Sequence, residues 1–227
     1  MPSPPLLFCD SDCLIQIFMV NQVPLLKWLK TQYRVQPIIV PEIYSELSWN
    51  GRFKDQFDRP LRKAVSAGVL SIFDYFRPEQ MPKHLSAPQA AIMAKAITDT
   101  GREYNLIVDL GEAYSHAACV HLGAPLLTQD TNAIRTLLDQ GKPTAVPVLR
   151  VFDLLALAFR RGGISEKACD TVRQLLSQST EFLPPAFRNA SFTNGIKTFD
   201  ARLYDESEST EPPPPCLKFN DPLFLSS

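Results

Sequence analysis

The sequence predicts a three-layer α/β/α sandwich with a central parallel sheet, followed by a flexible C-terminal tail. Short apolar runs alternate with amphipathic helical segments over the first 150 residues, as in parallel strands joined by crossover helices. The chain has 227 residues, 45% of them hydrophobic and 21% charged, which suffices to bury a core without covalent staples.

Five apolar runs are expected to form the strands. They are Leu6–Cys9, Val35–Val40, Val69–Phe73, Ala124–Thr128 and Thr144–Leu149. Pro147 places the last strand at an edge or an end of the sheet. Sites in such folds form at the carboxyl ends of the strands.

The helices are delimited by proline and glycine. Pro41 suits the first turn of a helix, where an N–H is not needed, and Gly68, Gly123 and Gly141 follow helix ends. The expected helices are Cys13–Val20, Val23–Tyr33, Pro41–Trp49, Gln56–Ala67, Pro88–Thr98, Asp109–Leu122, Asn132–Asp139, Val151–Arg160 and Ser165–Ser177. The proline-containing segment 76–86 is expected to be a loop.

Composition changes near residue 185. The chain therefore divides into a domain over 1–184, with its core at about 5–150 and closing helices at 151–178, and a tail over 185–227. The tail holds an acidic run at 205–211 and prolines at 212–215, a composition that buries too little apolar surface to become ordered. Its apolar end, 219–225, could dock on this chain or on a partner.

Composition also suggests a compartment. The five cysteines include no CxxC pair, which favours buried, reduced thiols and a reducing environment. The sequence shows no signal peptide and no run of roughly 18 apolar residues, so we expect a cytoplasmic protein with no membrane contact. The formal charge of −1 argues weakly against tight, non-specific nucleic-acid binding and leaves catalysis open.

Two acidic residues stand just past the carboxyl ends of predicted strands. Asp10 directly follows the first strand, and we favour a site role for it, while Asp12 is expected to cap the next helix. Asp130 follows the fourth strand. The alternative there is that Thr128 caps the following helix and that the dipole of this helix favours the negative charge of Asp130.

Two further pairs of acids lie on helices that follow strands. Glu42 and Glu46 share a helix face, and only Glu42 lies in the first turn, where the dipole favours an acid. Asp109 and Glu112 have the spacing of a capping box. Gly111 weakens that helix and is better explained if another group must approach its backbone.

Acids gathered at one edge of a sheet point to a divalent cation, because the cation removes their mutual repulsion. Mg²⁺ takes one or two carboxylates and keeps waters, and two ions can hold both oxygens of an in-line displacement. His116 lies one turn after Glu112 and could share a metal with it, although no HExxH pattern accompanies the pair.

Four segments resemble the motifs of the PIN-domain family, in order and spacing, over roughly residues 5–150. They are Phe8-Cys-Asp10-Ser-Asp-Cys-Leu-Ile15, Val40-Pro-Glu-Ile-Tyr-Ser-Glu46-Leu47, Asp109-Leu-Gly-Glu112-Ala113 and Leu126-Leu-Thr128-Gln-Asp130. The resemblance selects Glu46 over Glu42, since the functional acid of the second motif precedes Leu. Gln129 departs from the many relatives that carry an acid there, and residues 51–105 form a longer segment than a minimal toxin has.

The resemblance implies a metal-dependent endoribonuclease that cleaves RNA phosphodiester bonds with Mg²⁺ or Mn²⁺. The catalytic, metal-ligating residues would be Asp10, Glu46, Glu112 and Asp130, and the supporting residues would be Thr128, Ser11, Asp12 and Asp109. The branch it looks closest to includes VapC-like toxins. The partners to consider are therefore RNA, an antitoxin or other regulatory protein, and a second copy of the chain in a homodimer.

Basic residues follow the second motif. The set is Arg52, Lys54, Arg59, Arg62 and Lys63. They could contact phosphates, or they could be the solvated face of an amphipathic helix. Two other functions stay open: a non-catalytic interaction module with the PIN fold, and a haloacid-dehalogenase-like phosphatase, which the run Asp10-Ser-Asp12 resembles without that family's later motifs.

Overall fold

The fold is an α/β sandwich built on a parallel sheet, as the sequence predicts. The computed structural model describes residues 5–49, 51–83, 85–145, 147–177, 183–201, 203–205 and 217–219. The sheet has the strand order β3-β2-β1-β4-β5, with every neighbouring pair parallel. Its strands are β1 (Leu6–Cys9), β2 (Gln36–Ile39), β3 (Ser71–Ile72), β4 (Leu126–Leu127) and β5 (Val148–Leu149).

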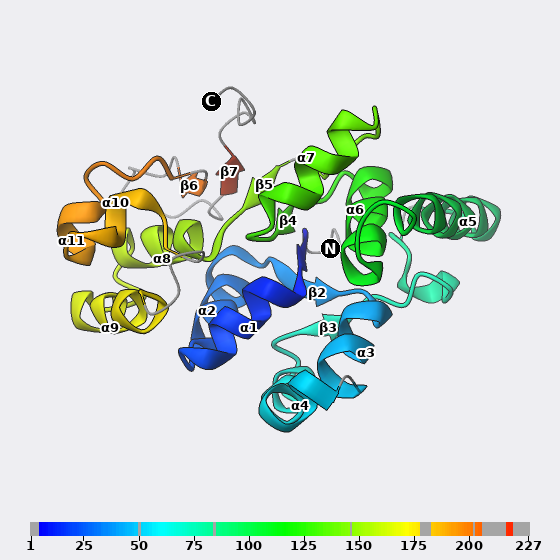
Figure 1. Ribbon diagram of the computed structural model, residues 1–227. Helices are drawn as coiled ribbons and strands as arrows, with labels where there is room; N and C mark the ends of the chain where they lie inside the picture. The colour runs from blue at the N-terminus through cyan, green and yellow to red at the C-terminus, as the bar shows by residue number, and fades with distance from the viewer. Residues whose placement is uncertain are drawn as a thin grey trace.

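Helices cover both faces of the sheet. They are α1 (Ser11–Met19), α2 (Val23–Tyr33), α3 (Pro41–Trp49), α4 (Gly51–Ser66), α5 (Ala87–Tyr104), α6 (Leu110–Leu122), α7 (Thr131–Asp139), α8 (Val151–Arg160), α9 (Glu166–Leu176), α10 (Pro185–Arg188) and α11 (Phe192–Gly195), with a 3-10 turn η1 (Pro78–Gln80) in the predicted loop. One face carries α1, α2 and α8, and the other carries α6 with α5 packed outside it (Figure 1). Within the described residues, no helix combines the length and the apolar character that a membrane crossing requires.

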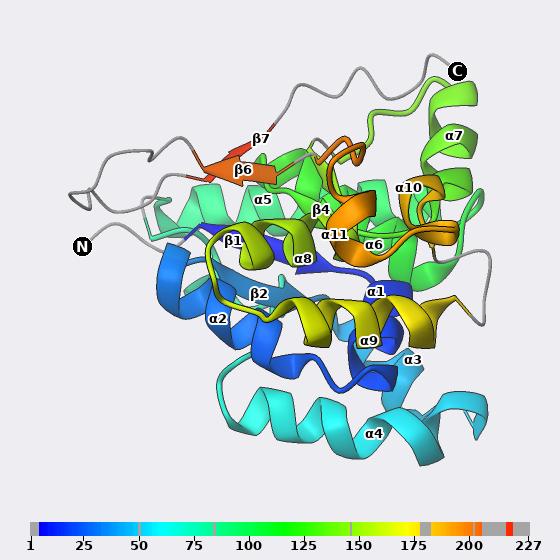
Figure 2. The same ribbon diagram turned by 90° about the vertical axis from the view of Figure 1, so that its left-hand side faces the viewer.

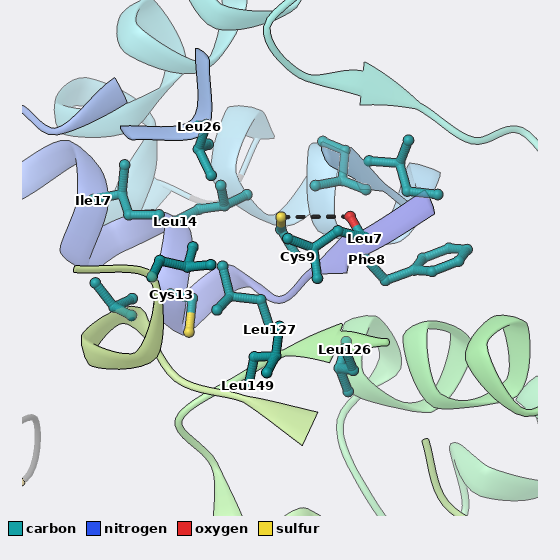
Figure 3. Close-up of a cluster of buried hydrophobic side chains, with 14 of the residues drawn as sticks. Leu7, Phe8, Cys9, Cys13, Leu14, Ile17, Leu26, Leu126, Leu127 and Leu149 are labelled. Atoms are coloured by element: carbon teal, nitrogen blue, oxygen red, sulfur yellow. Dashed lines mark hydrogen bonds between the residues drawn. The ribbon is translucent and has the colours of Figure 1, made fainter. Parts of the chain in front are cut away.

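The core is centred on β1, which lies between β2 and β4. Leu7, Phe8 and Cys9 of β1 are fully buried and pack with side chains of α1 and β4 (Figure 3). The Cys9 thiol donates a hydrogen bond to the Leu7 carbonyl oxygen at 3.7 Å, and burial raises the pKa of Cys9 to about 12. A thiol with so high a pKa is unreactive at neutral pH.

The other thiols within the described residues follow the same pattern. Cys13, Cys119 and Cys169 are also buried and free, which confirms the prediction of reduced, buried thiols for these positions. Cys216 lies outside the described residues.

Helix α5 continues beyond its predicted end at Thr98 to Tyr104. Gly101 does not end the helix, because its role is contact with α6. A Cβ atom on Gly101 would lie 2.5 Å from Cδ1 of Tyr114, far closer than two carbon atoms can approach. The glycine therefore lets α5 and α6 pack closely through the Tyr114 ring.

The predicted tail boundary at residue 185 is wrong, because residues 183–201 pack on the domain. Phe187 stacks on Phe192 with ring centroids 5.1 Å apart, and lies 4.8 Å from Phe152 of α8. Phe192 meets Phe159 of α8 edge-on at 5.4 Å. Burying large aromatic rings offsets the entropy of ordering the chain, so this segment folds where polar composition suggested a tail.

The remainder of the predicted tail is described only in part. The backbones of β6 (Leu203–Asp205) and β7 (Leu217–Phe219) pair antiparallel, and β6 lies beside α8 (Figure 2). The acidic and proline-rich residues 206–216 and the final residues 220–227 lie outside the described residues.

An arginine anchors the 183–201 segment to the carboxyl edge of the sheet. Arg150 directly follows β5 and forms two hydrogen bonds with the fully buried carboxylate of Asp153, at 2.9 and 3.0 Å. It also donates to the carbonyl oxygen of Asp200 at 2.8 Å, and its guanidinium lies 4.6 Å from the centre of the Phe199 ring. One side chain thus joins α8, β5 and the C-terminal segment.

Candidate metal centre

Asp10 is held rigidly at the carboxyl end of β1. Its Oδ1 accepts from the Ser11 N–H at 2.8 Å, and its Oδ2 accepts from the Thr128 hydroxyl at 2.9 Å. The helix cap predicted for Asp12 is wrong, since Asp10 is the residue that caps α1. Only 2% of Asp10 is exposed. Burial, and secondarily the charges of Asp12 and Glu46, raises its pKa to about 7.

Glu46 reaches the same place from α3. It is half-buried, and burial raises its pKa, against a hydrogen bond from Ser11 that lowers it. A Cβ atom on Gly111 would lie 3.1 Å from Oε2 of Glu46 and 2.5 Å from Cδ1 of Ile43. Gly111 is therefore required where α3 side chains approach the first turn of α6, as the sequence suggested.

Glu112 and Asp130 complete the group. Burial raises the pKa of Glu112 to about 9, and the charges of Asp10, Asp130 and Asp109, together with a hydrogen bond to Asp130, act in the same direction. The Asp130 Oδ1 accepts from the N–H groups of Asn132 and Ala133 at 2.6 and 3.1 Å. Asp130, and not Thr128, therefore caps α7.

Thr128 connects two members of the group. It is 3% exposed. Its hydroxyl donates a hydrogen bond to Asp10 and accepts one from the backbone N–H of Asp130 at 3.1 Å. Asp109 occupies the cap position of α6, but its side chain makes no capping hydrogen bond. The predicted capping box with Glu112 is therefore absent, and the charge of Asp109 instead faces Glu46 and Glu112.

The hydrogen bonds of Glu42 and His116 are made with residues other than the four acids. The Tyr75 hydroxyl donates to Oε1 of Glu42 at 2.6 Å, a contact that sequence reasoning missed because the two residues are 33 positions apart. His116 is 1% exposed and its Nδ1 accepts from the Ala145 N–H at 3.2 Å. Burial lowers its pKa to about 4, against the charge of Asp130, so its imidazole is neutral at pH 7, and a metal shared with Glu112 stays a prediction.

The four acids suit a divalent cation by their chemistry. As placed, no three His, Cys, Asp or Glu side chains of the described residues stand close enough together to hold a metal ion. The charges of Asp10 and Asp130 add to burial in raising the pKa of Glu112. Each Asp10 oxygen accepts one hydrogen bond and retains a lone pair. Carboxylate oxygens are the ligands that Mg²⁺ and Mn²⁺ prefer.

The predicted RNA-binding residues lie on α4, the helix that follows α3 and packs on it. Lys54, Arg59, Arg62 and Lys63 are exposed, and the Arg62 Nε is 2.7 Å from Oδ1 of Asp58. The Arg52 side chain lies outside the described part of the chain. The opposite face of α4 is buried, so both the phosphate contact and the solvated helix face remain open for these cations.

Crowding of the acids predicts that stability falls with pH in the absence of metal. The pKa of Glu112 rises from 4.5 to about 9 on folding, so the folded protein binds more protons than the unfolded chain between these values. Stability from this group is complete below pH 4.5 and is lost as the pH approaches 9. In EDTA, the melting temperature of Glu112→Gln should therefore fall less between about pH 5 and about pH 9 than that of the wild type.

The control for this measurement is Asp139→Asn, on the exposed end of α7. It should follow the wild-type profile, because it leaves the crowded carboxylates in place. Parallel profiles for Glu112→Gln and the wild type would contradict the crowding of Glu112.

Comparison with known proteins gives little further information. No protein-family model and no curated protein sequence matches the chain. A chain of the crystal structure of VapBC2 from Rickettsia felis bound to a DNA fragment from their promoter is similar at a TM-score of 0.40 and 14% sequence identity. The match covers 64% of this chain and 98% of that chain. Similarity at this level does not establish membership of a family.

Proposed function

We propose that this chain is a metal-dependent endoribonuclease whose Mg²⁺ or Mn²⁺ site is formed by Asp10, Glu46, Glu112 and Asp130. The observation that carries the proposal is the position of these acids: Asp10 and Asp130 follow β1 and β4 at the carboxyl edge of the parallel sheet, and Glu46 and Glu112 lie on α3 and α6, near enough for their charges to act on one another or on Asp10. Structural acids on a surface are normally solvated or paired with cations. The charge of Glu46 raises the pKa of Asp10, and the charges of Asp10 and Asp130 raise that of Glu112; a bound cation would remove this repulsion.

The residues have distinct roles in this proposal. When bound, the metal would activate a water and stabilise charge on the phosphate. Ser11 and Thr128 hold Asp10 in one orientation through hydrogen bonds to its two oxygens. The first turn of α7 fixes Asp130, and Glu112, whose pKa is raised by burial and by the charges of Asp10 and Asp130, would lose its proton when a cation is bound. Gly111 leaves the space in which Glu46 approaches α6.

The resemblance to VapC-like proteins adds a biological setting, in which the chain is the toxin of a toxin–antitoxin pair and an antitoxin is its protein partner. A gene for a small DNA-binding protein beside its own gene would support that setting.

The direct test of the function is an RNA cleavage assay. Purified full-length protein should cleave single-stranded or structured RNA in Mn²⁺ and should be inactive in EDTA. Failure to cleave any RNA in a diverse pool, with protein that is folded by circular dichroism, would reject the nuclease and favour a non-catalytic interaction module.

A further inference from the structure

A large aromatic side chain stands in solvent one helical turn after Glu46. Trp49 is the last residue of α3 and is 72% exposed. It lies three residues after Glu46, and residues at this spacing are neighbours on one side of a helix. Core packing does not explain an indole in this position, whereas the other tryptophan, Trp28, packs against Tyr33 with ring centroids 5.4 Å apart.

The surroundings of Trp49 are charged on both sides. Toward the start of α3 lies Glu46 with the acidic group. On the other side, α4 begins two residues after Trp49 and presents the exposed Lys54 within its first turns, then Arg59, Arg62 and Lys63. Helices α3 and α4 pack on each other, and the guanidinium of Arg62 lies near Tyr44 of α3. Exposed cations of α4 therefore follow the indole along the chain, and one of them, Arg62, is paired with Asp58.

This combination fits one class of ligand. An apolar protein partner would need a contiguous apolar surface around the tryptophan, whereas Glu46 precedes Trp49 by one helical turn and exposed cations of α4 follow it. Unpaired bases stack on aromatic rings irrespective of sequence, while their phosphates follow cations. The bases of a duplex are already stacked on each other and offer no free face to an indole.

We propose that Trp49 stacks an unpaired base of a single-stranded nucleic acid whose phosphates extend along α4, beginning at Lys54. For cleavage, this inference rests on the proposed nuclease function, since stacking next to Glu46 would position the strand at the acids. Trp49 is thus a positioning residue. The binding step itself needs neither a metal nor catalysis, and it can be measured separately.

The test is binding of a fluorescein-labelled single-stranded RNA of about 12 nucleotides, within the usual site size for single strands, to the full-length protein at low salt in EDTA, followed by fluorescence anisotropy. Trp49→Ala should weaken binding by roughly 10- to 100-fold, as loss of one stacked base predicts. Trp49→Phe should restore most of the affinity, because the phenyl ring still stacks. Leu175→Ala removes another exposed apolar side chain, 43% exposed on α9, and should bind as the wild type does.

Specific outcomes overturn the inference. Equal affinity of the wild type and Trp49→Ala, or equal affinity of the wild type for the single strand and its duplex, rejects stacking at Trp49. If Trp49→Ala loses binding in EDTA while the wild type cleaves no RNA in Mn²⁺, the stacking site stands and the nuclease proposal fails. If the wild type cleaves in Mn²⁺ and Trp49→Ala binds and cleaves equally well, the nuclease stands and the stacking site fails.

Discussion

Replacement of Asp10 by asparagine should abolish Mn²⁺-dependent RNA cleavage while the protein remains folded. Asp10 is the acid that connects the group, because its charge affects the Glu112 carboxyl and is itself affected by Glu46. A metal contributes several kcal/mol of charge stabilisation in phosphoryl and related transfers, and each ~1.36 kcal/mol is worth a factor of ten in rate. We therefore expect cleavage to fall by about 100-fold or more.

Folding should survive this change. The carbonyl oxygen of the introduced asparagine can accept from the Ser11 N–H, and the Thr128 hydroxyl can rotate to accept from the new amide. The variant also removes a buried carboxyl whose pKa is raised by burial. The melting temperature in EDTA should thus be equal to or above that of the wild type, whereas the increase in melting temperature on adding Mn²⁺ should be lost.

The matched control is a second acid on α3. Glu42→Gln keeps an oxygen that can accept from Tyr75 and lies outside the acidic group, so it should cleave as the wild type does. Glu46→Gln should resemble Asp10→Asn. Cleavage that persists in Asp10→Asn and Glu46→Gln would falsify the proposed site.

Removal of Arg150 should have the largest effect on stability. Arg150→Ala leaves the carboxylate of Asp153, which is fully buried, without its bidentate partner, and breaking a buried pair from one side costs about 3–5 kcal/mol. The variant also loses the hydrogen bond to the Asp200 carbonyl oxygen and the contact with Phe199. Urea denaturation should show the loss in the free energy of unfolding.

Arg62→Ala is the corresponding control at the surface. It breaks the Arg62–Asp58 pair, in which the arginine side chain is 56% exposed, and exposed pairs contribute little. The two variants should therefore differ clearly in their urea midpoints. Similar midpoints would show that Arg150 does not anchor the C-terminal segment. Limited proteolysis should cut residues 183–201 faster in Arg150→Ala than in the wild type.

The sequence was informative wherever a structural signal was local. β1, α2 and α3 have the bounds that were predicted, because each is an apolar or amphipathic run with a clear end. The packing of 183–201 could not be predicted in the same way. Its phenylalanines are separated by polar residues, and their partners Phe152 and Phe159 lie on α8, far away in sequence.

The candidate site follows the same rule. Position past a strand, or on the helix after it, selected Asp10, Glu46, Glu112 and Asp130, and the structure brings them to one edge of the sheet. Binding of a metal by them stays a prediction. The contacts that orient the acids could not be predicted from local patterns. Thr128 donates a hydrogen bond to Asp10, 118 positions away in the sequence, and Tyr75 donates one to Glu42, 33 positions away. The caps of α1 and α7 were also assigned wrongly, because two neighbouring side chains could have capped each helix: Asp10 or Asp12 at α1, and Thr128 or Asp130 at α7.

The hydrogen bond between Thr128 and Asp10 has a consequence for synthesis of the protein. On a ribosome, β4 is made more than a hundred residues after its neighbour β1. Until then, one side of β1 offers unpaired backbone groups, and the acids cannot be assembled. A nascent or truncated chain that ends before Asp130 therefore has no complete site, which confines any activity of the protein to chains whose translation has passed this point.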